Sequence, residues 1–394
     1  MLTTPPLSLY VHLPWCVRKC PYCDFNSYTL KGPLPEVAYL SALERDLESQ
    51  ARGLEGRPVI SVFFGGGTPS LFPPEAIGRV IEAARRHFIF AADAEITLEA
   101  NPGTVERGRF EGYRAAGVNR VSLGAQSFDA RQLEALGRIH SPEETRRAVE
   151  ELHAAGLSNF NLDLMYALPG QDVSAAVRDI DAALALQPAH LSHYQLTLEP
   201  GTQFAASPPQ LPEDDVAAEM LVVCQERLAD AGFAQYEVSA YARPGRECRH
   251  NLNYWLFGDY VGAGAGAHGK LTDCTTSTVV RTTQQREPRR YQAAAPHAIA
   301  RVPVPARDLP FEFMMNALRL TQGFEPGLFT ARTGLEWDAV APVIARLEAR
   351  GLLEIAGELC KPTARGVRFL NESLVEFLPE KPVLTGNPVM SMGS

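Results

Sequence analysis

The chain has 394 residues, of which 45% are hydrophobic and 21% charged, so it can bury a core and is not disordered throughout. This length predicts two or three domains. The net charge of −9 argues against electrostatic binding of nucleic acid over a broad surface, because such binding needs clustered lysines and arginines. No apolar stretch predicts a membrane span, although peripheral membrane contact is compatible with the composition. We see no secretory signal and expect a cytoplasmic protein.

Apolar runs alternate with helical spacing over residues 1–200. Helices are expected at 39–47, 77–84, 109–116, 142–155 and 173–186. Strands are expected at Leu7–His12, Val59–Phe64, Glu95–Ala100, Arg120–Gly124, Phe160–Tyr166 and His190–Leu196. Such alternation predicts an α/β core with a parallel sheet and right-handed crossovers. The periodicity alone does not decide between an open sheet and a barrel.

The pattern changes after residue 200. Residues 201–286 are predicted to extend the core, with a helix at 214–232 and an exposed strand at 234–242. Residues 287–310 are rich in proline and alanine and are predicted to be a linker. A helix–helix–hairpin order over 311–380 predicts a small, mostly helical, winged-helix-like module. Residues 381–394 are expected to be a disordered tail.

Three of the seven cysteines, Cys16, Cys20 and Cys23, form a C-x3-C-x2-C motif just after the first predicted strand. The odd cysteine number argues against a disulfide framework. Three thiolates can hold an iron–sulfur cube with one iron left open for a small ligand. Zinc completed by a distant fourth ligand is the alternative. The other four cysteines are scattered and are expected to be buried as small apolar residues.

Polar residues follow several of the predicted parallel strands. Gly65–Pro69, with three glycines and Thr68, follows the second strand, and Glu99, Gln126 and Asp163 lie at or near the ends of the next three. Ligands of α/β folds bind at this carboxyl edge. Two carboxylates and an amide suit a ligand with an ammonium group and ribose hydroxyls. Arg138 is a candidate partner for a ligand carboxylate, its alternative role being that of an exposed helix arginine.

A segment that combines one histidine with two aromatic residues lies further on, at Arg249–Trp255. His250, beside Tyr254 and Trp255, is a candidate axial ligand of haem or, alternatively, a hydrogen-bonded core residue. Cys248 is a weaker candidate thiolate ligand. His268, in the glycine-rich run 261–269, is a further candidate for contact with the ligand of the central pocket.

The cysteine motif, with an aromatic residue before its third cysteine, resembles the radical S-adenosylmethionine superfamily. Further motifs resemble the branch that contains oxygen-independent coproporphyrinogen III oxidase and a family of haem chaperones. These motifs are Tyr10–Cys16, Gly65–Pro69, Glu99–Gly103, Gly124–Ser127 and Leu162–Tyr166. The resemblance covers about residues 7–380. It implies a partial (β/α)6 barrel, in agreement with the strand–helix units above.

The resemblance also implies site residues and cofactors. Cys16, Cys20 and Cys23 would hold a [4Fe–4S] cluster whose open iron chelates S-adenosylmethionine. The methionine part of that ligand would be held by Gly66, Gly67, Thr68 and Glu99. The remainder of the nucleoside pocket would be lined by Tyr10, Tyr22, Gln126, Arg138 and Asp163.

Two features distinguish the chaperones from the oxidases. Phe25 stands where the oxidase type carries a further cysteine, and only fifteen residues precede Cys16. His250–Trp255 resembles the H-N-x-x-Y-W haem-binding motif of the chaperones. The favoured hypothesis is a chaperone, without catalytic residues, that binds haem through His250 and delivers it to an acceptor protein. The alternative is an oxidoreductase that decarboxylates coproporphyrinogen III to protoporphyrinogen IX. A one-electron donor is needed wherever S-adenosylmethionine is cleaved.

Overall fold

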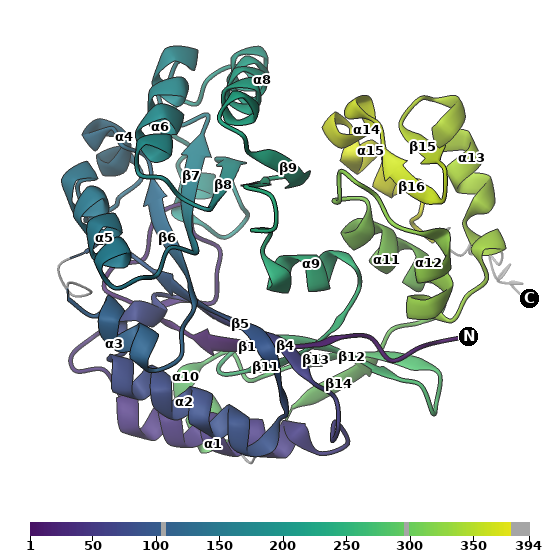
Figure 1. Ribbon diagram of the computed structural model, residues 1–394, viewed down its shortest axis with the longest axis horizontal. Coiled ribbons are helices and arrows are strands. Elements are labelled where there is room, and N and C mark those ends of the chain that lie inside the picture. The colour runs from purple at the N-terminus through teal and green to yellow at the C-terminus, as the bar shows by residue number, and fades with distance from the viewer. Residues whose placement is uncertain (104–107, 295–298, 380–394) are drawn as a thin grey trace, which may run out of the picture.

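The computed structural model describes residues 1–103, 108–294 and 299–379, so the predicted tail at 381–394 lies outside the described residues. Its main feature is a 12-stranded sheet with the order β14-β13-β12-β11-β1-β4-β5-β6-β7-β8-β10-β9. Within the described ranges β14 and β9 are the two free edges, so the sheet curves without closing (Figure 1). The α/β partial barrel predicted from the sequence is confirmed.

Seven neighbouring strands of this sheet are parallel: β11, described below, and six that lie within the first 200 residues. These six are β1 (Leu7–Leu13), β4 (Val59–Gly66), β5 (Phe90–Ala100), β6 (Arg120–Gln126), β7 (Phe160–Tyr166) and β8 (His190–Gln195). All six match predicted strands, and β5 begins five residues before its predicted start. Their residues are buried on both faces, as expected for parallel strands covered by helices on one side and a filled interior on the other.

Helices cover the outer face of these strands (Figure 1). They are α1 (Glu36–Ala51), α2 (Pro74–His87), α3 (Phe110–Ala115), α4 (Ala130–Ala135), α5 (Pro142–Ala154) and α6 (Val173–Ala185). The start of α5 shows why these boundaries can be predicted: Ser141 and Glu144 form a capping box, and Pro142 is the first helical residue. Of the six, α4 was not predicted.

The sheet continues beyond residue 200 on both sides. The helix predicted at 214–232 is α8 (Asp214–Asp230), after the short α7 (Gln203–Ala206). At 234–242 the prediction of one exposed strand is wrong: β9 (Ala234–Glu237) and β10 (Ala240–Ala242) form a hairpin. β10 is buried because it pairs antiparallel with β8. On the other side, β11 (Asp259–Ala263) pairs with β1 and is followed by β12 (His268–Asp273) and β13 (Thr278–Thr283).

The segment predicted as a linker carries two elements of the sheet domain. α10 (Pro288–Ala293) contacts α1, and β14 (Ala300–Pro303) pairs with β13. Tyr291 explains the placement of α10, because its buried hydroxyl donates to Asp46 Oδ2 of α1 at 2.8 Å. The Pro- and Ala-rich composition of the segment does not predict this contact, because a single aromatic residue makes it. The predicted domain limits themselves stay a prediction.

In the described part of the chain, the C-terminal module has three α-helices before its hairpin, where two were predicted, and two short helices after it. Its elements are α11 (Leu309–Ala317), α12 (Pro326–Thr333), α13 (Ala341–Ala349), β15 (Leu353–Ala356), β16 (Leu359–Pro362), α14 (Ala364–Arg368) and α15 (Leu370–Val375). Its core includes Phe257 and Val279 from the sheet domain, so the two parts pack together. No helix in the described ranges is long and apolar enough to cross a bilayer.

One short helix lies on the inner, concave side of the sheet. α9 (Arg249–Trp255) contacts β1 and β4 of the sheet and α11 of the C-terminal module. Figure 1 shows it in the open side of the curve, between the strands and the module. The aromatic segment singled out in the sequence therefore faces the interior of the partial barrel.

Candidate functional site

A cavity of about 500 Å³ lies at the carboxyl ends of the parallel strands. We call it the cysteine cavity. It brings together eleven of the residues predicted for the site, namely Cys16, Cys20, Tyr22, Cys23, Gly66, Gly67, Thr68, Glu99, Gln126, Arg138 and Asp163. The edge of the sheet thus collects side chains from segments up to 147 residues apart, as the topology of parallel strands requires. Two predicted residues, Tyr10 and His250, do not line it.

The cysteines lie on the loop between β1 and α1. This loop is held by its backbone: Cys23 N donates to Cys20 O at 3.1 Å, and Leu30 N to Cys16 O at 2.8 Å. All three cysteines are free and half-buried. Burial raises the pKa of the Cys16 and Cys23 thiols, so binding a metal centre there releases protons.

The thiol arrangement tests which metal centre fits. Among the described residues, the group of histidine, cysteine and carboxylate ligand atoms found within 4.8 Å of one another is Glu95, Cys248 and His250, and the three loop cysteines form no such group. Ligands of a single tetrahedral zinc would be roughly 3.8 Å apart, given Zn–S bonds of about 2.3 Å. Among the described residues no further cysteine and no histidine lines the cavity. The set fits an iron–sulfur cube, in which each thiolate binds a different iron and one iron lacks a protein ligand.

The end of β4 comes close to the backbone of the cysteine loop. A Cβ atom on Gly67 would lie 2.6 Å from Trp15 O, and one on Gly66 would lie 2.4 Å from His12 Cε1. Gly66 has φ of +113°, a conformation that side chains disfavour. Its amide donates to Glu99 Oε2 at 3.1 Å. Glycine at both positions therefore lets a bound ligand and the cysteine loop share the same strand end.

Replacing Gly66 with alanine should lower the free energy of unfolding by about 1–3 kcal/mol, because φ is positive and the new Cβ meets His12. Binding of S-adenosylmethionine should fall as well. Chemical denaturation and calorimetric titration measure the two effects. Gly327→Ala is the control, since nothing lies within 4 Å of a Cβ there. Equal stability of both variants would contradict the proposed crowding.

Two buried carboxyl groups face the cavity. Burial and the nearby charge of Asp163 raise the pKa of Glu99 to about 8. Burial also raises the pKa of Asp163, which accepts hydrogen bonds from Ser122 Oγ at 3.0 Å and Asn161 Nδ2 at 2.8 Å. Two carboxyl groups with raised pKa in one cavity are poised to ionise when a cationic or proton-donating ligand arrives.

Arg138 lies at the back of the cavity and not on an exposed helix surface, which was its alternative role. Its Nη2 donates to Asn101 Oδ1 at 2.6 Å and to Gly124 O at 2.8 Å, while Nη1 lies 3.7 Å from Cys20 Sγ. Its buried Nε has no hydrogen-bond partner in the described structure. A guanidinium held this way keeps one donor for a ligand and places a positive charge beside the thiols.

Gln126 ends β6 in a strained backbone conformation, with φ of +65°. Its Oε1 accepts a hydrogen bond from Tyr194 Oη at 2.8 Å. A non-glycine residue in the left-handed region persists only where its surroundings impose it, and such residues cluster at ligand sites. Tyr194, from β8, is a cavity residue that the sequence analysis missed, because it stands in an ordinary strand pattern.

A second cavity of about 720 Å³ adjoins the first, and we call it the aromatic cavity. Asp24, Phe25, Gly66, Glu99 and Trp255 line both cavities. Aromatic rings dominate its wall: Tyr10, Phe25, Phe63, Tyr254, Trp255, Phe257 and Tyr260. Basic side chains stand beside them: His268, Lys270, Arg281 and Arg286. The cavity therefore suits a flat, apolar ligand that carries carboxylates.

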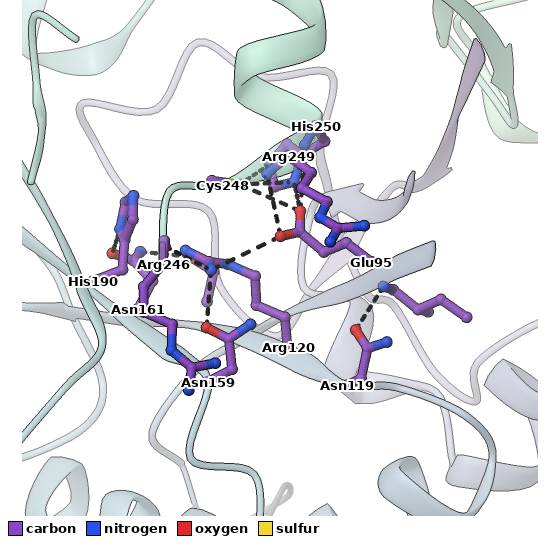
Figure 2. Close-up of polar contacts among 12 residues, drawn as sticks. Glu95, Asn119, Arg120, Asn159, Asn161, His190, Arg246, Cys248, Arg249 and His250 are labelled. Atoms are coloured by element: carbon purple, nitrogen blue, oxygen red, sulfur yellow. Dashed lines mark hydrogen bonds and ion pairs between the residues drawn. The ribbon is translucent and has the colours of Figure 1, made fainter. Parts of the chain in front are cut away.

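His250 lies in neither cavity but in a buried polar cluster with Glu95 and Cys248 (Figure 2). Its Nδ1 lies 3.0 Å from Glu95 Oε1 and 2.9 Å from Cys248 Sγ, and its ring stacks on Phe63 with centroids 4.2 Å apart. Burial lowers the pKa of His250. Haem ligation by His250 stays a prediction, and it would require the imidazole to leave these partners.

Glu95 is the centre of this cluster, which the sequence analysis missed. Burial alone would raise its pKa, but the hydrogen bond and charge of His250 and the charge of Arg120, whose Nη1 lies 3.9 Å from Oε2, bring it to about 2. The backbone amides of Arg249 and His250 donate to it at 3.2 and 3.3 Å. Glu95 thus anchors the start of α9, and no local pattern links residues 155 positions apart.

Comparison with known proteins agrees with this geometry. Residues 10–183 match the family model of the radical SAM superfamily, and residues 304–369 match that of the HemN C-terminal domain. Radical SAM enzymes bind a [4Fe–4S] cluster and S-adenosylmethionine. The solved coproporphyrinogen III oxidase HemN of Escherichia coli, described as a radical SAM enzyme, has a TM-score of 0.80 at 25% identity, over 95% of this chain and 90% of that one.

Three curated relatives cover almost the whole chain. The haem chaperone HemW of Escherichia coli K12 is 47% identical over 380 residues, which are 96% of this chain and 100% of that protein. HemW of Mycobacterium tuberculosis H37Rv is 40% identical over 95% of each chain. The mouse mitochondrial radical S-adenosyl methionine domain-containing protein 1 is 36% identical over 95% of this chain and 87% of its own. The chain therefore belongs to the radical SAM superfamily and, within it, to the family of the haem chaperone HemW.

Proposed function

We propose that the protein is a haem chaperone that carries a [4Fe–4S] cluster and S-adenosylmethionine in the cysteine cavity, binds haem in the adjoining aromatic cavity, and delivers it to an acceptor protein. The observation that carries this proposal is the pair of contiguous cavities, which share Phe25, Trp255 and Glu99. One has thiols and paired carboxyl groups, and the other has aromatic walls with basic groups. The relatives named as haem chaperones support the same assignment.

Within the cysteine cavity each side chain has a distinct role. Cys16, Cys20 and Cys23 bind the cluster, which supplies an electron to S-adenosylmethionine wherever that ligand is cleaved. The methionine part is held by Gly66, Gly67, Thr68 and Glu99. Tyr22, Gln126, Arg138 and Asp163 line the remainder of the nucleoside pocket. Thr68 is oriented for this by Asn101, whose Nδ2 donates to Thr68 Oγ1 at 3.0 Å.

Tyr10 lines the aromatic cavity and lies on β1, which pairs with the end of β4 that reaches both cavities. Its hydroxyl lies 2.7 Å from His12 Nδ1, and its ring stacks on Phe63 with centroids 6.0 Å apart. Both rings line the aromatic cavity, while Gly66, next to His12, lines both cavities. A ligand in the cysteine cavity that contacts this strand end therefore also contacts part of the wall of the haem site. The resident ligand can stabilise the haem site without any bond between the two.

A haem titration of the reconstituted protein tests this proposal. Haemin should bind with a shifted Soret band, and Phe25→Glu should weaken binding at least about tenfold, because it places a charge against an apolar ligand. Ile89→Glu is the matched control, since both side chains have the same exposed fraction of 59%. The bound haem should then move to apomyoglobin, used as a model acceptor. Wild-type protein that binds no haem, or equal binding by both variants, contradicts the proposal.

A second candidate is the oxidase activity, which the similarity to the HemN structure favours. The aromatic cavity would then hold coproporphyrinogen III, whose propionates would be decarboxylated by a radical derived from S-adenosylmethionine. Phe25, in place of the further cysteine of the oxidase type, speaks against it. Anaerobic assay with coproporphyrinogen III, S-adenosylmethionine, a reductant for the cluster and an electron acceptor for the substrate radical decides: we expect no protoporphyrinogen IX, and sustained turnover would replace the chaperone proposal.

A further inference from the structure

We propose that the haem iron is ligated by His268 and that Arg286 pairs with a haem propionate. This inference rests on the proposed haem binding and specifies where in the aromatic cavity the haem lies. It differs from the prediction made from the sequence, which places the iron on His250. The observation that supports it is that both residues line the aromatic cavity, His268 at the start of β12 and Arg286 in the loop after β13.

His268 is the exposed member of the histidines that line this cavity. It begins β12, and Thr283 Oγ1, on the paired strand β13, lies 3.3 Å from its Nδ1. Contact at Nδ1 fixes the ring and leaves Nε2 for a metal, which is how metal-ligating histidines are usually oriented. Burial, Arg281 and Arg286 lower the pKa of His268, so the imidazole is neutral and able to ligate.

The other candidate imidazoles are already engaged. His12 lines the same cavity but is buried, with Tyr10 Oη 2.7 Å from its Nδ1 and Asn26 O 2.9 Å from its Nε2. His250 lies behind Phe63 and is engaged at both ring nitrogens, because its Nδ1 lies 3.0 Å from Glu95 Oε1 and its Nε2 lies 3.3 Å from Cys248 Sγ. Either residue would have to break buried hydrogen bonds before it could reach an iron, and His268 would not.

Arg286 is the basic side chain of the cavity without a committed partner. Lys270 Nζ is buried against Asp259 Oδ1 at 2.8 Å, and Arg281 pairs with Glu312 and with the hydroxyl of Tyr260. Arg286 is exposed, and its guanidinium makes no hydrogen bond or ion pair with the residues that the structure describes. A free guanidinium beside an apolar cavity suits a carboxylate on a flat ligand.

The backbone beside His268 and Arg286 is hydrogen-bonded to the cysteine loop. Asn26, three residues after Cys23, donates from Nδ2 to Ala265 O at 2.9 Å and to Arg286 O at 3.0 Å. Gly266 makes this possible, because a Cβ there would lie 2.2 Å from Asn26 Nδ2. The loop that holds the cluster therefore fixes the position of the segment that carries His268 and Arg286.

The test compares haemin titrations of the reconstituted wild-type protein with His268→Ala, His250→Ala and the exposed control His87→Ala. His268→Ala should weaken binding about tenfold or more and lose the iron–histidine band in the resonance Raman spectrum of the ferrous form. Added imidazole should restore that spectrum. His250→Ala should keep the iron–histidine signature. The cluster absorbance of each variant reports that the fold is intact.

The role of Arg286 is tested by comparing haem with a haem whose propionates are blocked. Arg286→Gln should weaken haem binding about two- to fivefold, as for an exposed ion pair, and should leave binding of haem dimethyl ester unchanged. An iron–histidine band that survives in His268→Ala but disappears in His250→Ala overturns the proposal while keeping haem binding. Haem binding with wild-type affinity by every variant also overturns the proposal. Wild-type protein that fails to bind haemin removes the proposed function itself.

Discussion

Cys20→Ala should reduce the iron and sulfide content of the anaerobically reconstituted protein to background. With three protein thiolates available, loss of one leaves two irons of a cube without a protein ligand, and such a cluster does not persist. Cys20 is also the thiol nearest to the Arg138 guanidinium, 3.7 Å from Nη1, which favours a bound thiolate. Iron and sulfide analysis together with the visible absorption spectrum measures the loss.

Two control variants make that result specific. Cys274 is exposed and Cys224 is buried, and neither lines the cysteine cavity. Cys274→Ala should retain the full cluster, and Cys224→Ala should retain it as long as the protein is folded. A Cys20→Ala protein with wild-type iron and sulfide, or one that instead retains a single zinc ion, contradicts the cluster assignment.

Glu99→Gln should weaken binding of S-adenosylmethionine about tenfold or more while leaving the cluster in place. A carboxylate that accepts a hydrogen bond from a ligand amine contributes about 1.5–3 kcal/mol, and the amide replaces it with a neutral group of the same shape. Glu82→Gln, on the exposed side of α2, is the control. Isothermal titration calorimetry measures both. Unchanged affinity in Glu99→Gln would remove Glu99 from the site.

The same residue gives this binding a pH dependence. The pKa of Glu99 is about 8 because of burial and Asp163, so the side chain is mostly protonated below that pH in the ligand-free protein. Only the ionised form is purely an acceptor. Affinity should therefore rise as pH increases from 6.5 towards 8.5, and Glu99→Gln should show a flatter profile. An affinity that falls over this range contradicts the role given to Glu99.

The parallel strands were predictable because each is a short, mostly apolar run between segments with helical spacing. β1, β4, β6, β7 and β8 begin at the predicted residue, and the cysteines, Gly66, Glu99 and Asp163 meet where the topology places them. This part of the site was predictable because each of these residues lies within its own parallel strand or in the loop that follows it. A parallel sheet then brings those ends together without further information.

The rest of the site depends on contacts that no sequence pattern records. Glu95 meets His250 across 155 residues, so His250 is a buried, hydrogen-bonded core residue, which was the alternative to haem ligation in the sequence analysis. Arg138 follows a helix yet turns inward to Asn101 and Gly124. The aromatic cavity combines Phe63, Trp255 and Tyr260 from β4, α9 and β11, so it exists only once the sheet has curved.

The buried cluster around Glu95 holds α9 in place. It fixes the start of the helix whose other end presents Tyr254 and Trp255 to the aromatic cavity. Arg319 of the C-terminal segment packs over the Trp255 ring at 4.3 Å, so the helical module supports the same wall. The haem motif thus shapes the cavity in this structure through its aromatic residues, with His250 as their anchor.

A crystal structure of the anaerobically reconstituted protein with S-adenosylmethionine and haem tests the central claim most directly. The account predicts a cube held by Cys16, Cys20 and Cys23 with S-adenosylmethionine on its open iron. It also predicts a haem in the aromatic cavity, flanked by Phe25 and Trp255, with its iron on His268. A fourth protein ligand on the cluster, or a haem bound outside that cavity, would contradict it.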